Sequence, residues 1–227
     1  MMSETRCVSN ILHERGSAIW ERATRHPMVQ QIGDGSLPHE KFRYYFSQNI
    51  LYLEDYCRAL GLTAGKAPDA DALQVISTFL ARVASQEISA NHRFFEKLGG
   101  DPTTIDPMWS MAPTTYGYTR HLLHVASQGD CAAGLTAILP CQWSYGELAK
   151  PLSINLPADP IYAEWIGVFG NEEYDSLVAA TTGLLDRLVD PDDEARLGQL
   201  AWIFEVSTRY EVMFWDMAFA GAVEQLA

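Results

Sequence analysis

The sequence of 227 residues predicts an all-α protein, a helical bundle formed by a single domain over residues 1–227. Three observations support this prediction. Apolar residues recur at helical spacing through almost the whole chain, and no segment shows the strict alternation of a strand. Glycine, proline and aspartate gather where helices are expected to end. No repeat, low-complexity tract or long linker divides the chain.

In chain order, helices are expected at residues 6–25, 38–65, 69–98, 114–127, 130–149, 159–167, 170–188 and 191–222. Ser36 is the expected N-cap of the second helix, with Pro38 in its first turn, and Asp69 is the expected N-cap of the third. Residues 99–113 form the longest loop. A loop of this length in a compact bundle is often tied to a binding site.

The charge distribution excludes some classes of partner. The formal net charge is −13, and between Glu164 and Glu194 nine carboxylates stand with a single arginine, Arg187. This segment is typical of a solvated surface, and it argues against nucleic-acid binding, which needs a lysine and arginine footprint. The longest apolar stretch near the end, 212–223, is interrupted by Asp216, so no membrane span is expected. The first residues do not resemble a signal peptide, and a cytoplasmic location is the expectation.

Neither the cysteines nor the histidines predict a metal site. The four cysteines are far apart and form no Cys-x-x-Cys pair, so reduced thiols are expected at positions 7, 57, 131 and 141. The six histidines show none of the Glu-x-x-His pairing that a di-iron bundle needs. No metal and no cofactor are expected.

The segment Pro140-Cys141 places a thiol directly after a proline inside an apolar helical run. A proline in a helix interior costs about 3 kcal/mol or more, so such a break usually has a cause. One interpretation is a kinked core helix whose cysteine acts as a small hydrophobic residue. The other is a nucleophile, with the phenol of Tyr145, four residues on, sharing its helix face.

One face of the helix at 38–65 carries four aromatic side chains and one amide, at Phe42, Tyr45, Asn49, Tyr52 and Tyr56. The stripe is typical of a bundle core in which a neighbour satisfies the asparagine. It also suits a pocket wall that stacks a flat ring and reads its edge. The stripe alone favours the core.

Glu211 stands among apolar and aromatic residues in the last helix, 191–222. Desolvation in such surroundings raises the pKa of a carboxyl group toward the range that general acid–base catalysis uses. A salt bridge or a surface position is the alternative, and Glu205 has a similar setting. Tyr116 and Tyr118, at the start of the helix at 114–127, suit either a pocket mouth or simple packing.

Several segments, in this order along the chain, resemble the TenA (thiaminase II) family. They lie at residues 26–38, 42–45, 48–53, 116–119, 139–145, 160–167 and 210–215 and cover the chain from about residue 20 to about residue 220. The resemblance implies a heme-oxygenase-like all-α fold, a homotetramer and hydrolysis of aminopyrimidines in thiamin salvage. The implied substrate is 4-amino-5-aminomethyl-2-methylpyrimidine, released as its hydroxymethyl form plus ammonia, with slower cleavage of thiamin.

The same resemblance implies roles for individual residues. Cys141 would be the nucleophile and Glu211 the acid–base, and the pyrimidine site would be lined by Tyr52, Tyr118, Tyr145 and Phe214. These residue types suit the reaction, because a thiolate that adds to a ring carbon removes the aromaticity that otherwise holds the leaving group. A carboxylic acid then protonates a ring nitrogen and helps deliver water.

The chain departs from the family at two substrate-binding positions. Asn49 stands where the family usually has an aspartate that binds the amino edge of the pyrimidine, and Phe169 stands where it has a tyrosine. An asparagine amide complements a neutral aminopyrimidine edge, as it does adenine, whereas a carboxylate complements a doubly donating, protonated edge. We therefore expect Asn49 to preserve ring recognition and to weaken ring activation, or to accompany a different substrate.

Two other classes of function are compatible with the same fold. One is a non-catalytic pyrimidine-binding or regulatory protein, although the acidic charge argues against direct contact with DNA. The other is an oxidase relative of the pyrroloquinoline-quinone synthase type, which lacks the Pro-Cys motif.

Overall fold

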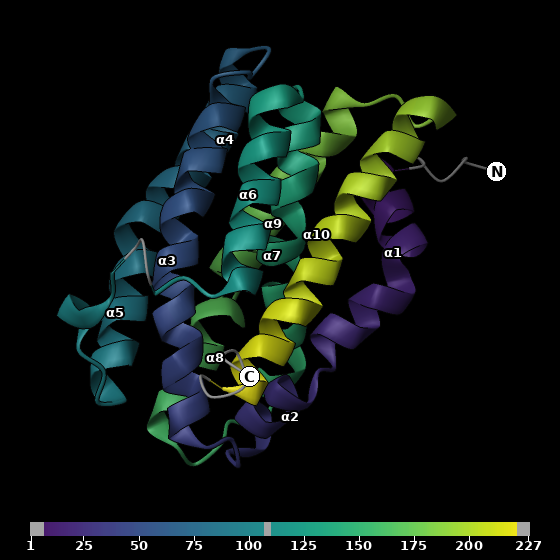
Figure 1. The fold of residues 1–227 in the computed structure, drawn as a ribbon. Coiled ribbons are helices and arrows are strands. Elements are labelled where there is room, and N and C mark those ends of the chain that lie inside the picture. The colour runs from purple at the N-terminus through teal and green to yellow at the C-terminus, as the bar shows by residue number, and fades with distance from the viewer. Residues whose placement is uncertain (1–6, 107–109, 222–227) are drawn as a thin grey trace.

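The computed structural model describes residues 7–106 and 110–221, and their helices pack into one bundle (Figure 1). In chain order the elements are α1 (Val8–Thr24), α2 (Pro27–Asp34), α3 (His39–Ala64), α4 (Ala70–Arg82), the π-helix η1 (Val83–Glu87), α5 (Ile88–Lys97), the 3₁₀ turn η2 (Pro102–Thr104), α6 (Pro113–Gln128), α7 (Cys131–Ser153), α8 (Pro160–Phe169), α9 (Glu172–Leu188) and α10 (Glu194–Ala220). The described residues contain no strand. The predicted all-α class is confirmed.

Most of the expected helices are present, with three differences. Residues 27–34 form the short helix α2, which the sequence patterns did not predict; the ring of His26 caps it by accepting from Met28 N. The expected helix at 69–98 is divided by η1. The predicted cap at Ser36 is wrong: α3 begins at His39, its N-cap position is Pro38, and no side chain caps it.

The reason for the wrong cap is the turn that follows α2. The backbone N–H of Ser36 is bound by the carbonyl of Gln31 and by the Asp34 carboxylate, both at 2.9 Å, so Ser36 closes the preceding helix instead of opening the next. The other predicted cap is confirmed, because Asp69 accepts from Ala72 N at 2.8 Å.

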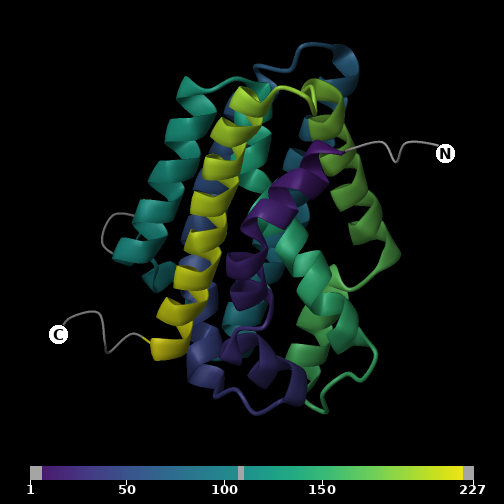
Figure 2. The same cartoon turned by 90° about the vertical axis from the view of Figure 1, so that its right-hand side faces the viewer.

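Helix α7 lies at the centre of the bundle, in contact with α3, α6, α8, α9 and α10. Its residues from Cys131 to Pro140 are buried on every side, as expected for a helix surrounded by others. Helix α1 runs across α10 and also contacts α7 and α9, which closes that side of the bundle (Figure 2). The helix that carries Cys141 is thus fixed from all directions.

Helices α3 and α7 approach each other closely at Gly134. A Cβ atom there would lie 2.3 Å from Thr63 Oγ1 and 2.9 Å from Thr63 Cγ2, and Thr63 is fully buried. Glycine therefore allows a backbone contact that no larger residue permits. This contact lies two helical turns before Cys141 and fixes the distance between α7 and the aromatic stripe of α3.

The buried amide of Gln48 on α3 fixes the start of α6. It accepts from Ala112 N at 2.8 Å and from Thr115 Oγ1 at 2.9 Å, and it donates to Ser110 O at 2.8 Å. These bonds anchor the end of the predicted loop at 99–113, of which residues 107–109 lie outside the described part. They also set the position of Tyr118, one turn into α6.

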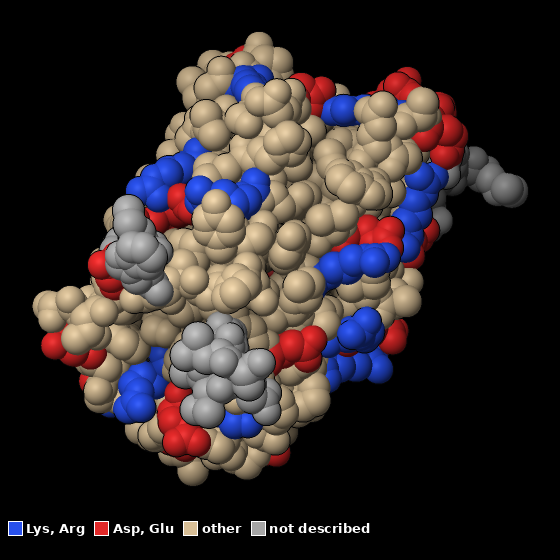
Figure 3. Space-filling view, in the orientation of Figure 1, with Lys and Arg blue, Asp and Glu red and all other residues tan. Residues whose placement is uncertain are grey.

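The acidic segment lies at the surface, as predicted. None of its nine carboxylates is buried, and several pair with cations of other helices, as Glu164 does with Lys97 at 2.5 Å and Asp175 with Lys150 at 2.9 Å. The face formed by α3, α6 and α10 is different, since uncharged residues dominate its middle (Figure 3). Within residues 7–106 and 110–221, no helix combines the length and the apolar character needed to cross a membrane.

Candidate active site

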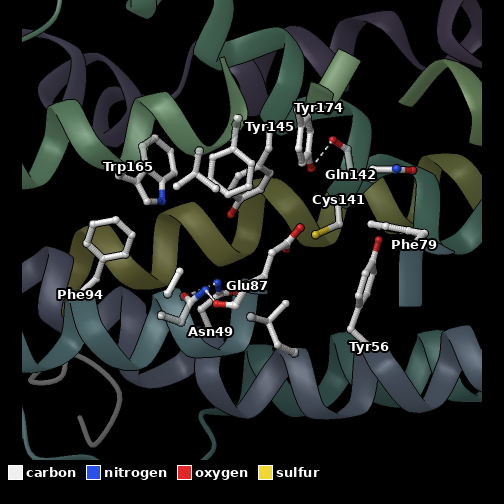
Figure 4. A pocket seen from close by; sticks show the side chains of 15 residues that line it. Asn49, Tyr56, Phe79, Glu87, Phe94, Cys141, Gln142, Tyr145, Trp165 and Tyr174 are labelled. Atoms are coloured by element: carbon white, nitrogen blue, oxygen red, sulfur yellow. Dashed lines mark hydrogen bonds between the residues drawn. The ribbon is translucent and has the colours of Figure 1, made fainter. Parts of the chain in front are cut away.

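A pocket of about 500 Å³, a volume that includes its opening to solvent, lies between α3, α5, α7 and α8 (Figure 4). Most of its walls are aromatic or aliphatic, and a few polar groups converge on it. Its lining residues are Asn49, Leu53, Tyr56, Phe79, Glu87, Ala90, Asn91, Phe94, Cys141, Gln142, Tyr145, Trp165, Val168, Phe169 and Tyr174. An apolar pocket with few polar groups suits a small flat ligand that carries hydrogen-bonding substituents.

Two tyrosines hold the backbone on either side of Cys141. The hydroxyl of Tyr56 on α3 donates to Ile138 O at 3.1 Å, and the hydroxyl of Tyr174 on α9 donates to Gln142 O at 3.0 Å. Both tyrosines are buried and also line the pocket. Hydrogen bonds from α3 and α9 therefore hold the backbone around Cys141, in addition to the hydrogen bonds within α7 itself.

The Cys141 thiol faces the pocket, directly after the fully buried run 131–140 of α7 (Figure 4). Burial, together with the nearby Glu211 carboxylate, raises the pKa of this thiol well above its ordinary value. The hydroxyls of Tyr52 and Tyr56 interact with the sulfur and partly offset the rise in pKa. A raised pKa favours the protonated thiol, so Cys141 needs a base to become a nucleophile.

Glu211 is placed to be that base. Its carboxylate, 3% exposed, accepts a 2.6 Å hydrogen bond from the Tyr118 hydroxyl, and it interacts with the Cys141 side chain. Burial raises the pKa of Glu211 to about 7, and the interactions with Tyr118 and Cys141 limit the rise. The expectation that apolar surroundings raise this pKa is confirmed. Glu205 differs, because it forms a surface ion pair with Arg209 at 2.5 Å.

The predicted site residues form one connected group in two layers. Four of them line the pocket: Asn49, Cys141, Tyr145 and Phe169. The other four are buried and are not part of its lining: Tyr52, Tyr118, Glu211 and Phe214. In that second layer the ring of Tyr52 lies 5.0 Å from Tyr118 and 5.8 Å from Phe214. Tyr116, the other phenol of the predicted pair, is 55% exposed on the surface of α6.

Some residues of the aromatic stripe of α3 line the pocket, and others pack in the core. Tyr56 lines the pocket, whereas Phe42 is enclosed in the core and Tyr45 shares a 2.9 Å hydrogen bond with Tyr145. Asn49 combines the two roles. It lines the pocket, and its amide donates to Asn91 Oδ1 at 2.8 Å, while Asn91 donates to the backbone carbonyl of Glu87 at 2.8 Å.

The sequence patterns did not predict one wall of the pocket. Phe79, Glu87, Asn91 and Phe94 come from the segment 70–97, which carried no motif. A signal was present in the spacing, because these residues follow one another at near-helical intervals and two of them are polar on an otherwise apolar stripe. Within the described residues, no three His, Cys, Asp or Glu side chains gather as metal ligands would.

The chain is similar to known proteins along most of its length. The model of the TENA/THI-4/PQQC family matches residues 13–220. An aminopyrimidine aminohydrolase of Halalkalibacterium halodurans is 33% identical over 211 residues, which cover 92% of this chain and 93% of that protein.

Solved structures agree with this likeness. A TenA homologue from P. horikoshii OT3 matches with a TM-score of 0.85 at 27% identity, covering 95% of this chain and all of that one. A protein of heme-oxygenase-like fold from Shewanella denitrificans OS217 matches with a TM-score of 0.72 at 13% identity, covering 92% of this chain and 90% of that one, a likeness of fold alone. The family match and the fold lead to one conclusion: this chain belongs to the TENA/THI-4/PQQC family.

Proposed function

We propose that this protein hydrolyses thiamin-related aminopyrimidines, with Cys141 as nucleophile and Glu211 as acid–base. The observation that carries the proposal is the contact between the Cys141 thiol and the Glu211 carboxylate, beside a pocket lined with aromatic rings. A relative that is 33% identical is an aminopyrimidine aminohydrolase, which supports the same class of substrate. The proposed substrate is 4-amino-5-aminomethyl-2-methylpyrimidine, with thiamin as a slower alternative.

The first step activates the thiol. Glu211 takes the proton of Cys141, and the thiolate adds to a carbon of the ring while Glu211 passes the proton to a ring nitrogen. A carboxyl group whose pKa is about 7 can both accept and donate a proton near neutral pH. The developing thiolate needs no permanent cation, because its charge passes to the ring as the new bond forms.

The second step releases the amine. The ring is no longer aromatic, so the methylene C–N bond breaks, its electron pair leaves with the protonated amine as ammonia, and Glu211 takes back the proton of the ring nitrogen. Water then adds to the exposed methylene carbon, and one of its protons passes to the ring through Glu211. The carbon–sulfur bond breaks last, the ring recovers its aromaticity, and the thiol regains its proton.

The aromatic lining is expected to hold the substrate ring flat over Cys141. Tyr145 and Phe169 lie with ring centroids 5.0 Å apart in an edge-to-face arrangement, and Trp165 packs 5.4 Å from Phe169. Such walls favour an offset-stacked heteroaromatic ring. Asn49 lines the pocket as well, and we propose that Tyr52, Tyr118 and Phe214, which are buried outside its lining, also belong to the substrate site. Because Phe169 has no hydroxyl, one hydrogen bond expected in the family is absent from this site.

We place the reaction in thiamin salvage in the cytoplasm, and we propose a homotetramer, in line with the family. Large apolar side chains on α6 and α10 are exposed, including Tyr116 at 55% and Trp202 at 63%. Exposed aromatic side chains are enriched at contacts between subunits.

The test is an ammonia-release assay with the aminomethylpyrimidine, and product analysis with thiamin and with the N-formyl derivative. Wild type is expected to hydrolyse at least the aminomethyl compound, and Cys141→Ser is expected to lose at least about a hundredfold in kcat. Cys57→Ser, a half-buried cysteine elsewhere on α3, is the matched control and is expected to stay active. A wild type that binds these compounds without turning them over, or an active Cys141→Ser, contradicts the proposal.

A further inference from the structure

A second carboxylate, Glu87, enters the same pocket, and the mechanism above does not use it. It is the last residue of the π-helix η1, between α4 and α5. π-Helical turns are rare in proteins overall, and those that do occur are often found at functional sites. Figure 4 shows the Glu87 side chain directed into the pocket toward the side occupied by Cys141.

One oxygen of the Glu87 carboxylate has no hydrogen-bond donor. Its Oε1 is buried and accepts no hydrogen bond from the described residues. Arg82 forms a long ion pair with it: the Arg82 Nε lies 3.9 Å from Glu87 Oε1, beyond hydrogen-bonding distance, and this Nε has no hydrogen-bond partner among the described residues. Arg82 is bound elsewhere, since it donates to Glu173 at 2.5 Å and its guanidinium lies over the ring of Tyr174. A buried oxygen without a donor costs free energy.

The charge of Glu87 acts on the whole pocket. It contributes to the raised pKa of Cys141, of Tyr56 and of Tyr174, groups that reach the pocket from α7, α3 and α9. Its own pKa is raised to about 7 by burial, and Arg82 lowers it only in part. A cation that entered the pocket would therefore stabilise the ionised carboxylate and relieve this burial penalty.

The neighbouring amides leave Glu87 free for such a role. Asn49 is held by Asn91, and Asn91 is held by the backbone carbonyl of Glu87, so the asparagine pair is fixed and uncharged. The amide of Asn49 complements a neutral amino edge of a ring. The carboxylate one turn before Asn91 complements a positively charged substituent instead.

Resting on the function proposed above, we propose that Glu87 is a specificity-determining residue that binds the primary ammonium group on the side arm of the substrate. The ion pair selects substrates whose leaving group is a protonated amine. It is lost when that group departs as ammonia, because the hydroxymethyl product is neutral. The same contact thus favours binding of the amine and release of the alcohol.

The test compares two substrates that share one ring. The aminomethylpyrimidine carries an ammonium, and its N-formyl derivative carries a neutral amide. For Glu87→Gln, the ratio of kcat/KM for the amine to that for the formyl compound is expected to fall at least tenfold, mainly through KM. Glu96→Gln, an exposed glutamate of α5, is the matched control and should keep the wild-type ratio. An unchanged ratio, or an equal loss with both substrates, overturns the proposal.

Equilibrium binding separates this inference from the proposed function. Calorimetry with the aminomethyl and hydroxymethyl pyrimidines measures the preference for the ammonium without any turnover. Wild type is expected to bind the amine at least tenfold more tightly than the alcohol, and Glu87→Gln is expected to lose this preference. If wild type shows the preference but hydrolyses nothing, only the proposed reaction fails. If wild type is active and binds both compounds equally, only the role of Glu87 fails.

Discussion

The hydroxyl of Tyr118 donates a 2.6 Å hydrogen bond to the carboxylate of Glu211 in the interior of the bundle. This bond joins α6 to α10, and the same carboxylate interacts with the Cys141 side chain of α7. Burial raises the pKa of Glu211, and the donated hydrogen bond lowers it, so that the balance lies at about 7. Tyr118 thus sets the proton affinity of the group proposed to carry protons.

Removal of this hydroxyl is expected to change the pH dependence of the reaction. In Tyr118→Phe the ionised form of Glu211 loses a donor, so its pKa should rise above about 7. The basic form is then less populated at neutral pH, and the acidic limb of the kcat/KM profile should move to higher pH. The measurement is a pH–rate profile, with Tyr116→Phe at the exposed neighbouring phenol as the control. Identical profiles for wild type and Tyr118→Phe would refute this assignment.

Glu211 is expected to make the protein less stable as the pH rises. Its pKa is raised from the ordinary 4.5 to about 7, so the folded state binds a proton more tightly than the unfolded state. The free energy of unfolding should therefore fall between about pH 4.5 and about pH 7, by up to about 3 kcal/mol from this residue. Glu87 acts in the same direction.

Urea unfolding of wild type and Glu211→Gln at pH 5 and pH 8 measures this effect. The variant should show a smaller loss of stability between the two pH values, because glutamine does not titrate. Glu205→Gln, in the surface ion pair with Arg209, should behave as wild type. If Glu211→Gln loses as much stability as wild type over this range, the carboxylate is not protonated in the folded protein at low pH.

Asn49 is expected to limit the rate of ring activation. In Asn49→Asp, a carboxylate faces the amino edge of the substrate and favours its protonated, doubly donating form, so hydrolysis of the aminomethylpyrimidine should become faster. Asn49→Leu, which removes the hydrogen-bonding amide at similar volume, should weaken binding of every pyrimidine. The measurement is kcat and KM for each variant. Rates that are unchanged by Asn49→Asp for all pyrimidines would disprove the activation argument.

The contact between α3 and α7 is expected to tolerate no side chain at position 134. In Gly134→Ala the new Cβ would lie 2.3 Å from Thr63 Oγ1, and the buried threonine cannot move aside. Overpacking of this kind costs about 1–3 kcal/mol. Gly183→Ala is the matched control, since nothing lies within 4 Å of its Cβ, and helix propensity predicts a gain of about 0.5–1 kcal/mol. Equal stability of the two variants in chemical denaturation would contradict the close approach.

Trp202 is expected to lie at a contact between subunits. Its side chain is 63% exposed on α10, and Trp202→Glu would place a charge in any interface that covers it. The molar mass from light scattering is expected to fall from that of a tetramer to a smaller species. Glu205→Gln is a suitable control. A wild type that is monomeric at all concentrations would refute the proposed assembly.

The sequence determined the helical class, most helix positions and the residues of the proposed mechanism. Helical periodicity is a local property, and it predicted seven of the helices to within a few residues. The apolar neighbours of Glu211 along its own helix were sufficient to predict a raised pKa, and Glu211 does lie on the buried face of α10.

Contacts between distant segments were decided only by the tertiary structure. The pairing of Tyr118 with Glu211 and of Asn49 with Asn91 joins helices far apart in the chain, and no spacing along one helix reveals such a partner. Glu87 was missed for the same reason. Its position in the pocket depends on a π-helical turn and on the packing of α5 against α3. Its proposed role depends on the 3.9 Å distance to Arg82, which is too long for a hydrogen bond. Local spacing fixes the face of a helix on which a side chain lies, but only the packed bundle fixes what that face meets.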